Sequence, residues 1–162
     1  MTESERPATS SVTLTPIGRV ECPRVEAIDD DWGAIDSVIH LDGEQFTEEV
    51  LAGLGDFSHI DVVYFFDRVD ESKITLGSRH PRNRPDWPLV GIFAQRAKAR
   101  PNRLGVTTCE LLAVSGLHVT VRGLDAIDGT PVLDIKPHVR EFQPRTPVEQ
   151  PDWIGELMAG YW

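Results

Sequence analysis

Short apolar runs separated by glycine- and proline-containing turns constrain the fold of this chain more than any other feature. The run from Phe57 to Phe66 is too apolar for a half-exposed strand, so it predicts a central strand. Ser115-Gly116 stands between two further runs, where a two-residue hairpin turn is expected. We predict strands over residues 12–20, 34–41, 57–66, 104–114, 117–124 and 132–135. Many short strands joined by such turns predict a mainly β fold, a small β-barrel or compact sheet with short helices.

Helix signals are sparse. Thr47 is placed to cap a short helix, with Glu48 and Glu49 in its first turn and Val50, Leu51 and Leu54 on its apolar side. Residues 151–162 form the other helix candidate, although two glycines lower its helix propensity; Trp153, Leu157 and Trp162 are available to dock it. No Gly-x-Gly-x-x-Gly follows a predicted strand, so the pattern argues against a Rossmann fold.

The length of 162 residues fits one domain. We expect a flexible tail over residues 1–13, the barrel domain over 14–145 and a C-terminal extension or helix over 146–162. No apolar run approaches the ~20 residues that span a bilayer, and the first residues lack a signal-peptide core. Cys22 and Cys109 are too far apart to suggest a metal cluster. We therefore expect a cytoplasmic protein with reduced thiols, no metal and no membrane partner.

The charge is unevenly distributed. Between residues 79 and 103, seven basic side chains oppose one acidic side chain, which gives this window +6 and leaves −16 for the rest of a chain whose net charge is −10. The basic residues are Arg79, Arg82, Arg84, Arg96, Lys98, Arg100 and Arg103. A cationic window on an acidic body favours a local anionic ligand over a long nucleic-acid track, and solvated loop charges are the alternative. From this window we take Arg79, Arg82, Arg100 and Asn102 as substrate-binding candidates, since guanidinium groups bind carboxylates or stack on bases.

A polar turn at residues 125–131 is the clearest candidate for a binding loop. Asp125 and Asp128 offer acceptors, Gly129 permits unusual dihedrals and Pro131 keeps Thr130 extended. Such a turn is suited to a ribose diol or an amino group, and a plain Asp-Gly turn between strands is the alternative. The strand that follows places Asp134 and Lys136 on one side, either as a structural ion pair or as part of a polar pocket.

Several longer motifs occur in an order that is typical of one family. They are Cys22-Pro-Arg-Val25, Phe57-Ser-His59, Phe66-Asp67, the segment from Gly91 to Gly105 that contains Arg-Pro-Asn, and Asp128-Gly-Thr-Pro-Val-Leu-Asp-Ile-Lys-Pro137. Together these motifs resemble the TrmO/TsaA-like β-barrel methyltransferases, and the resemblance spans about residues 16–142.

The resemblance implies a non-Rossmann TsaA-like barrel that binds S-adenosyl-L-methionine, typically as a homodimer with cofactor sites near the subunit contact. It also implies N-methylation of N6-threonylcarbamoyladenosine beside a tRNA anticodon. Carried over by motif position, the cofactor contacts are Pro23, Arg24, Val25, Phe66, Asp67, Arg96, Val106, Asp125, Ala126, Ile127, Asp128, Gly129 and Thr130. Because an amide or carbamoyl nitrogen is a poor nucleophile, a base or polarising contact is also expected, and the catalytic candidates are Asp67, His80, Asp134 and Lys136.

The chain departs from the family pattern at several positions. Val25 stands where the family has Gln, Asp67 where it has His, and Gln95-Arg96-Ala97-Lys98 where it has Thr-Arg-Ser-Pro. Arg103 replaces a Pro, and we expect no counterpart of the additional C-terminal domain of the longer tRNA-modifying members. A small-molecule or peptide N-methyltransferase is therefore an alternative to tRNA methylation. A non-catalytic S-adenosylmethionine-binding regulator is a third.

Overall fold

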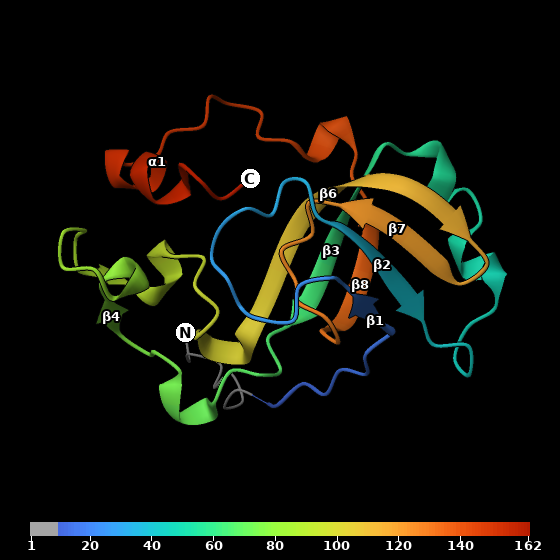
Figure 1. The fold of residues 1–162 in the computed structure, drawn as a ribbon, viewed down its shortest axis with the longest axis horizontal. Helices are drawn as coiled ribbons and strands as arrows, with labels where there is room; N and C mark the ends of the chain where they lie inside the picture. The colour runs from blue at the N-terminus through green and yellow to red at the C-terminus, as the bar shows by residue number, and fades with distance from the viewer. Residues whose placement is uncertain (1–9) are drawn as a thin grey trace, which may run out of the picture.

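The computed structural model describes residues 10–162, and its centre is a closed antiparallel barrel with the strand order β1-β2-β7-β6-β3-β8 (Figure 1). The strands are β1 (Gly18–Glu21), β2 (Asp36–Leu41), β3 (His59–Phe65), β6 (Leu104–Ser115), β7 (His118–Arg122) and β8 (Pro131–Pro137). The predicted mainly β, non-Rossmann barrel is thus confirmed. Most of the predicted tail, residues 1–9, lies outside the described residues.

Inward-facing and outward-facing side chains alternate along the strands, and the inward-facing ones fill the barrel. On β3, Ile60, Val62 and Tyr64 are buried, whereas the residues between them are half-buried. Ile39 of β2 and Val132 of β8 are fully buried in the same core. β3 pairs with β6 on one edge and with β8 on the other, as a central strand does, although in a small closed barrel only its inward face is filled by side chains.

Several strand bounds differ from the expectation. The first strand begins at Gly18 and not at residue 12, because Val12 and Leu14 are 80% and 57% exposed and have no core to pack against. The hairpin between β6 and β7 is confirmed, with the turn at Gly116–Leu117, one residue later than expected, and Gly116 at φ 60°. β8 is longer than predicted and pairs with both β1 and β3, which closes the barrel.

The helices are short. The 3-10 turns are η1 (Glu48–Leu51), η2 (Leu54–Asp56), η3 (Glu71–Lys73), η4 (Pro81–Asn83), η5 (Ile92–Ala94), η6 (Pro101–Arg103) and η7 (Arg140–Phe142). Thr47 precedes η1 as predicted, but its side chain forms no cap hydrogen bond and Val50 is exposed. The one α-helix of the described residues, α1 (Asp152–Met158), ends four residues before the C-terminus.

The chain between β3 and β6 leaves the barrel and forms a second small sheet from β4 (Ser78–Arg79) and β5 (Val90–Gly91). This excursion and α1 lie on the same side of the barrel (Figure 1), where Trp87 Nε1 donates to Glu156 Oε2 at 3.0 Å. No helix among residues 10–162 is long and apolar enough to cross a membrane. Within the same residues, no group of three or more His, Cys, Asp or Glu side chains is arranged to hold a metal ion.

Candidate functional site

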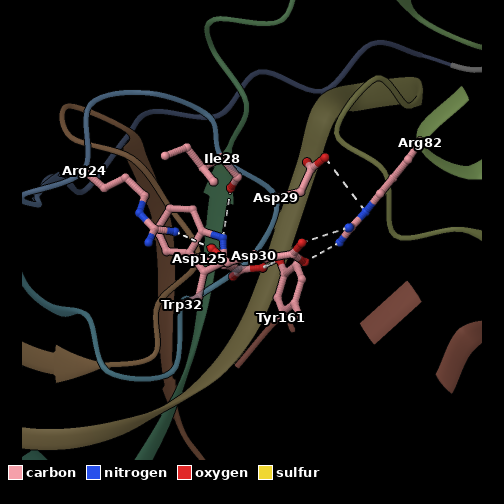
Figure 2. Close-up of polar contacts among 8 residues, drawn as sticks. All are labelled: Arg24, Ile28, Asp29, Asp30, Trp32, Arg82, Asp125 and Tyr161. Atoms are coloured by element: carbon pink, nitrogen blue, oxygen red, sulfur yellow. Dashed lines mark hydrogen bonds and ion pairs between the residues drawn. The ribbon is translucent and has the colours of Figure 1, made fainter. Parts of the chain in front are cut away.

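Asp125, in the loop between β7 and β8, receives hydrogen bonds from three hydroxyl groups. The Tyr64 hydroxyl donates to Oδ1 at 2.8 Å, and the Thr107 hydroxyl donates to the same oxygen. The Tyr161 hydroxyl, from the C-terminal segment, donates to Oδ2. Figure 2 shows Tyr161 and Asp125 side by side. A half-buried carboxylate is thereby fixed in orientation by donors from β3, β6 and the C-terminus.

The two tyrosines remain hydroxyl donors at neutral pH. Burial raises the pKa of Tyr64 far above its ordinary value, and the charge of Asp125 raises it further. Burial and then Asp125 raise the pKa of Tyr161 in the same way. A carboxylate has about four acceptor positions, and these three hydroxyls occupy two on Oδ1 and one on Oδ2. One position on Oδ2 therefore remains for a ligand hydroxyl or ammonium group.

Asp128 fastens the binding loop to the segment after β1. Its Oδ1 accepts from the Cys22 backbone N–H at 3.0 Å, and its own N–H donates to the Arg24 carbonyl at 2.8 Å. Gly129 follows at φ 80°, a left-handed conformation that favours glycine, as expected from the sequence. Arg68 donates to the carbonyls of Asp128 and Val25 at 3.0 and 3.2 Å.

The segment from Pro23 to Ile35 forms a shallow groove of about 340 Å³ beside this loop. It is lined by Pro23, Arg24, Val25, Glu26, Ile28 and Ile35. The Arg24 guanidinium stacks on the Trp32 ring at 4.3 Å and donates to the Asp30 carbonyl at 2.6 Å (Figure 2). It also donates to the Asp31 carbonyl at 2.9 Å. The groove thus has apolar walls and a guanidinium that stiffens the backbone around it.

Arg82 connects the groove to the excursion. It donates to both carboxylate oxygens of Asp30, at 2.7 and 3.1 Å, and its Nε lies 3.8 Å from Asp29 (Figure 2). This bond is the largest cause that lowers the pKa of Asp30, and Asp30 in turn raises the pKa of Arg82. A run of three aspartates such as Asp29-Asp30-Asp31 is typical of a solvated turn, but here two of the three lie against Arg82. Arg82 serves here to hold two loops together.

The other cofactor contacts expected from the resemblance lie after β3, before and on β6, and in the loop between β7 and β8. Arg96 donates to the Val106 carbonyl at 2.6 Å, which attaches it to β6. Phe66 packs edge-on against Tyr64, with ring centroids 5.4 Å apart. Ala126 and Thr130 are buried, with Ile127 half-buried between them. Asp67 is exposed at the turn after β3.

The catalytic candidates are not all near one another. Asp134 and Lys136 form an ion pair at 2.6 Å, as the sequence allowed, on the outward face of β8, and within residues 10–162 neither contacts the Asp125 cluster. His80 accompanies Arg82 in the excursion, and its Nδ1 bonds the Trp87 carbonyl at 2.7 Å. Because a carbonyl only accepts, Nδ1 carries the proton and Nε2 of the neutral ring is an acceptor.

The remaining substrate-binding candidates are mostly engaged within the chain. Arg100 donates to the Gln95 carbonyl at 2.7 Å, and Arg79 donates to Asn83 at 3.2 Å. Arg79 Nε is buried without a hydrogen-bond partner among the described residues. Asn102 is exposed at φ 62°. The basic window is therefore less available to a ligand than its charge suggests, because its guanidinium groups already bond backbone carbonyls or side chains of the same chain.

The geometry fits an adenosyl ligand with a cationic centre. Apolar groove walls suit a purine, and the free Oδ2 position of Asp125 suits a ribose hydroxyl or an ammonium group. The volume is at the lower end of the ~300–1,000 Å³ typical of small-molecule sites. The residues that would hold such a group are Pro23, Val25 and Asp125, with Arg24 and Asp128 keeping the loop in shape.

Sequence reasoning missed four residues of this site. Tyr64 and Thr107 were read as strand residues, although the alternation of β3 and β6 places both inside the barrel. Arg68 had no motif to distinguish it. Tyr161 had been passed over in favour of Trp153, Leu157 and Trp162 as docking residues, yet Trp162 is 59% exposed. An inward strand position that carries a hydroxyl was the available signal for the first two.

Comparisons with known proteins relate this chain to one family of methyltransferase domains. The family model of the tRNA-methyltransferase O N-terminal domain matches residues 19–143. A Methanothermobacter thermautotrophicus protein named as a probable S-adenosyl-L-methionine-binding protein is 34% identical over 135 residues, which cover 81% of this chain and 93% of that protein. The mouse tRNA (adenine(37)-N6)-methyltransferase is 37% identical over 95 residues, which cover 59% of this chain but 22% of the mouse protein.

Solved structures agree. A crystal structure of TrmO matches with a TM-score of 0.72 and 26% identity over 87% of this chain and 64% of that one. TrmO from Pseudomonas aeruginosa matches with a TM-score of 0.69 and 26% identity over 86% and 62%. The chain thus spans less than two thirds of these structures and about a fifth of the mouse relative.

Proposed function

Because this chain belongs to the tRNA-methyltransferase O N-terminal domain family, we propose that it is an S-adenosyl-L-methionine-dependent N-methyltransferase acting on an adenosine beside a tRNA anticodon. Relatives named as tRNA (adenine(37)-N6)-methyltransferases support this acceptor. The observation that carries the proposal is Asp125, held by three hydroxyls in a loop that is bonded to the apolar groove segment, at a motif position where the resemblance implies a cofactor contact. Within this class we propose N6-threonylcarbamoyladenosine as the modified nucleoside.

S-Adenosylmethionine supplies an activated methyl group when it is bound. The chain's own contribution is to bind and orient: Asp125 accepts a hydrogen bond, and the apolar walls of the shallow Pro23–Ile35 groove contact one face of the adenosyl part. Methyl transfer then depends on in-line positioning. For the proton of the acceptor nitrogen, the available candidates are the exposed carboxylate of Asp67 and Nε2 of His80. Asp134 and Lys136, paired on the outer face, are less suited.

A non-catalytic S-adenosylmethionine-binding role is the second candidate. It is favoured by the names of several relatives: one of similar length, of which this chain covers 93%, is named only as a probable S-adenosyl-L-methionine-binding protein, and two further archaeal relatives carry the same description. A small-molecule or peptide N-methyltransferase would use the same barrel and remains a prediction from the departures at Val25, Asp67 and Arg103.

The test is incubation of the full chain with isotope-labelled S-adenosylmethionine and either total tRNA or a pool of free nucleosides and amino-acid-like acceptors. Labelled methyl in tRNA nucleosides, found by mass spectrometry, supports the proposal; label in the small-molecule pool supports the alternative acceptor. Asp125→Asn should abolish the product, whereas Asp56→Asn, which changes an exposed carboxylate on η2, should not. Cofactor binding without product would establish the regulator role instead.

We also propose that the chain forms a homodimer. The two-stranded β4–β5 sheet and its flanks expose Leu76, Leu89 and Phe93, which are 83%, 60% and 79% exposed. Large exposed apolar side chains near one small sheet suit a self-complementary contact. Light scattering should give twice the monomer mass, and Phe93→Asp should reduce it to the monomer. We further propose a cytoplasmic location, since both cysteines are present as thiols, and cell fractionation tests this.

A further inference from the structure

The C-terminal segment, residues 151–162, returns to the barrel after α1 and reaches the site from outside the family match, which ends at residue 143. Three contacts fix it. The Asp31 N–H donates to the Gly160 carbonyl at 2.9 Å, and the Trp32 N–H donates to the Tyr161 carbonyl at 2.8 Å. The Trp87 indole donates to Glu156. The segment is therefore attached to both the groove loop and the excursion.

The approach of the segment to the groove loop is close. A Cβ atom built on Gly33 would lie 2.6 Å from the carbonyl carbon of Trp162, so only glycine fits there. Tyr161 packs against the barrel core, and its hydroxyl reaches Oδ2 of Asp125 (Figure 2). This is the oxygen with an acceptor position remaining for a ligand. Tyr161 therefore determines the direction of the remaining acceptor position on Oδ2 of Asp125.

We propose that Tyr161 is a positioning residue for the cofactor, and that the C-terminal segment is a fixed wall of the binding site. The proposal rests on the proposed cofactor function. Tyr161 acts through Asp125: with Oδ1 held by Tyr64 and Thr107, the Tyr161 hydroxyl sets the rotation of the carboxylate and hence the direction of the remaining acceptor position on Oδ2. The alternative is that the segment is a latch that must leave before the cofactor binds.

A double-mutant cycle tests the action through Asp125. Titration calorimetry with S-adenosylmethionine compares the wild type, Tyr161→Phe, Asp125→Asn and the double variant. We expect Tyr161→Phe to weaken binding about tenfold, or ~1.4 kcal/mol, in the wild type and less than about twofold in the Asp125→Asn background. Equal effects in both backgrounds, or no effect in the wild type, would overturn the proposal.

Glu156→Ala is the matched control, because it removes the contact with Trp87 from the same segment and leaves the Tyr161 hydroxyl in place. It should lower the melting temperature at least as much as Tyr161→Phe while keeping the cofactor affinity within about twofold. A tenfold loss in this variant as well would mean that affinity follows the general attachment of the segment, and the positioning role would be rejected.

Hydrogen exchange in the wild type shows whether the C-terminal segment stays attached when the cofactor binds, as a fixed wall, or detaches, as a latch. The amides of Asp31 and Trp32 report the attachment, since they bond the carbonyls of Gly160 and Tyr161. A fixed wall predicts unchanged or slower exchange at these amides when S-adenosylmethionine is added. Faster exchange would show release of the segment and overturn the proposal. A wild type that binds no S-adenosylmethionine in calorimetry would instead refute the proposed function.

Discussion

Arg82 and Asp30, 52 residues apart in the chain, form a two-bonded ion pair that ties the excursion after β3 to the groove loop after β1. Arg82 holds this position with a left-handed backbone, at φ 49°. A non-glycine residue in that region is uncommon and costs energy, so surrounding contacts must maintain it. The pair therefore links local backbone geometry to the shape of the candidate cofactor site.

Asp30→Asn should destabilise the chain at pH 7 and not at low pH. Because Arg82 lowers the pKa of Asp30, the stabilisation is present above the ordinary carboxyl pKa of 3.8 and is lost as the pH falls through the lower folded value. The Asp30 side chain is 38% exposed, so screening limits the effect to about 0.5–1 kcal/mol. Urea unfolding of both proteins at pH 7 and pH 3 measures it.

The matched control is Asp56→Asn, which changes an exposed carboxylate that has no ion pair among residues 10–162. Its free energy of unfolding should follow that of the wild type at both pH values. A difference between Asp30→Asn and the wild type that persisted unchanged at pH 3 would contradict an ionic role for the pair.

The strand pattern and the motif order were enough to predict the barrel and the family, because inward alternation and turn residues are local properties of the sequence. Asp125 and Asp128 were found in the same way, since both lie in one short loop. Tyr161 was not, because its contact with Asp125 depends on how a C-terminal segment folds back across the barrel. Pairings of this kind are set by tertiary packing and leave no periodic signal.

The basic window shows the same limit in electrostatic terms. Its charge of +6 was readable, but the partners of the individual guanidinium groups were not. Arg103, for example, donates to the Val69 carbonyl at 2.8 Å and stacks on Phe65 at 4.6 Å. Composition measures how many charges a segment carries, whereas only the fold decides how many of them remain available to a ligand.

Stability should fall above pH 9 because of Cys109. Burial raises the pKa of its thiol to about 12 from the ordinary 9.0. The stabilisation is complete below pH 9 and is lost as the pH rises toward 12, since the unfolded thiol ionises first. Each pH unit above 9 should remove about 1.4 kcal/mol of the free energy of unfolding. The Cys109→Ala variant should be less stable at pH 7, but its free energy of unfolding should fall much less between pH 9 and 10 than that of the wild type. If the free energy of unfolding fell equally steeply with pH in both proteins, Cys109 would not be the group responsible.

Gly105→Ala should disturb the site from within the barrel. A Cβ atom at this position would lie 2.4 Å from Cε2 of Tyr64 and 3.0 Å from Phe66, and Tyr64 is fully packed. The displaced tyrosine would lose its bond to Asp125, so we expect at least fivefold weaker binding of S-adenosylmethionine and a destabilisation of about 1–3 kcal/mol. Gly77→Ala, where nothing lies within 4 Å, is the control and should change neither calorimetric affinity nor melting temperature.

If tRNA is the acceptor, its binding should depend only weakly on salt. Each phosphate contact to a single strand contributes a slope of about 0.7 in log affinity against log salt concentration. Arg82, Arg100 and Arg103 are engaged within the chain, and the net charge is −10, so we expect about two contacts and a slope near −1.4.

Lys98 is exposed and has no ion pair among the described residues. Lys98→Ala should therefore make the slope shallower by about 0.7, whereas Arg122→Ala, which removes a side chain already paired with Asp36 on the barrel, should leave it unchanged. A slope steeper than about −3.5, measured by fluorescence anisotropy of a labelled anticodon stem-loop, would require about five contacts. It would show that the internal guanidinium bonds open to admit the RNA backbone.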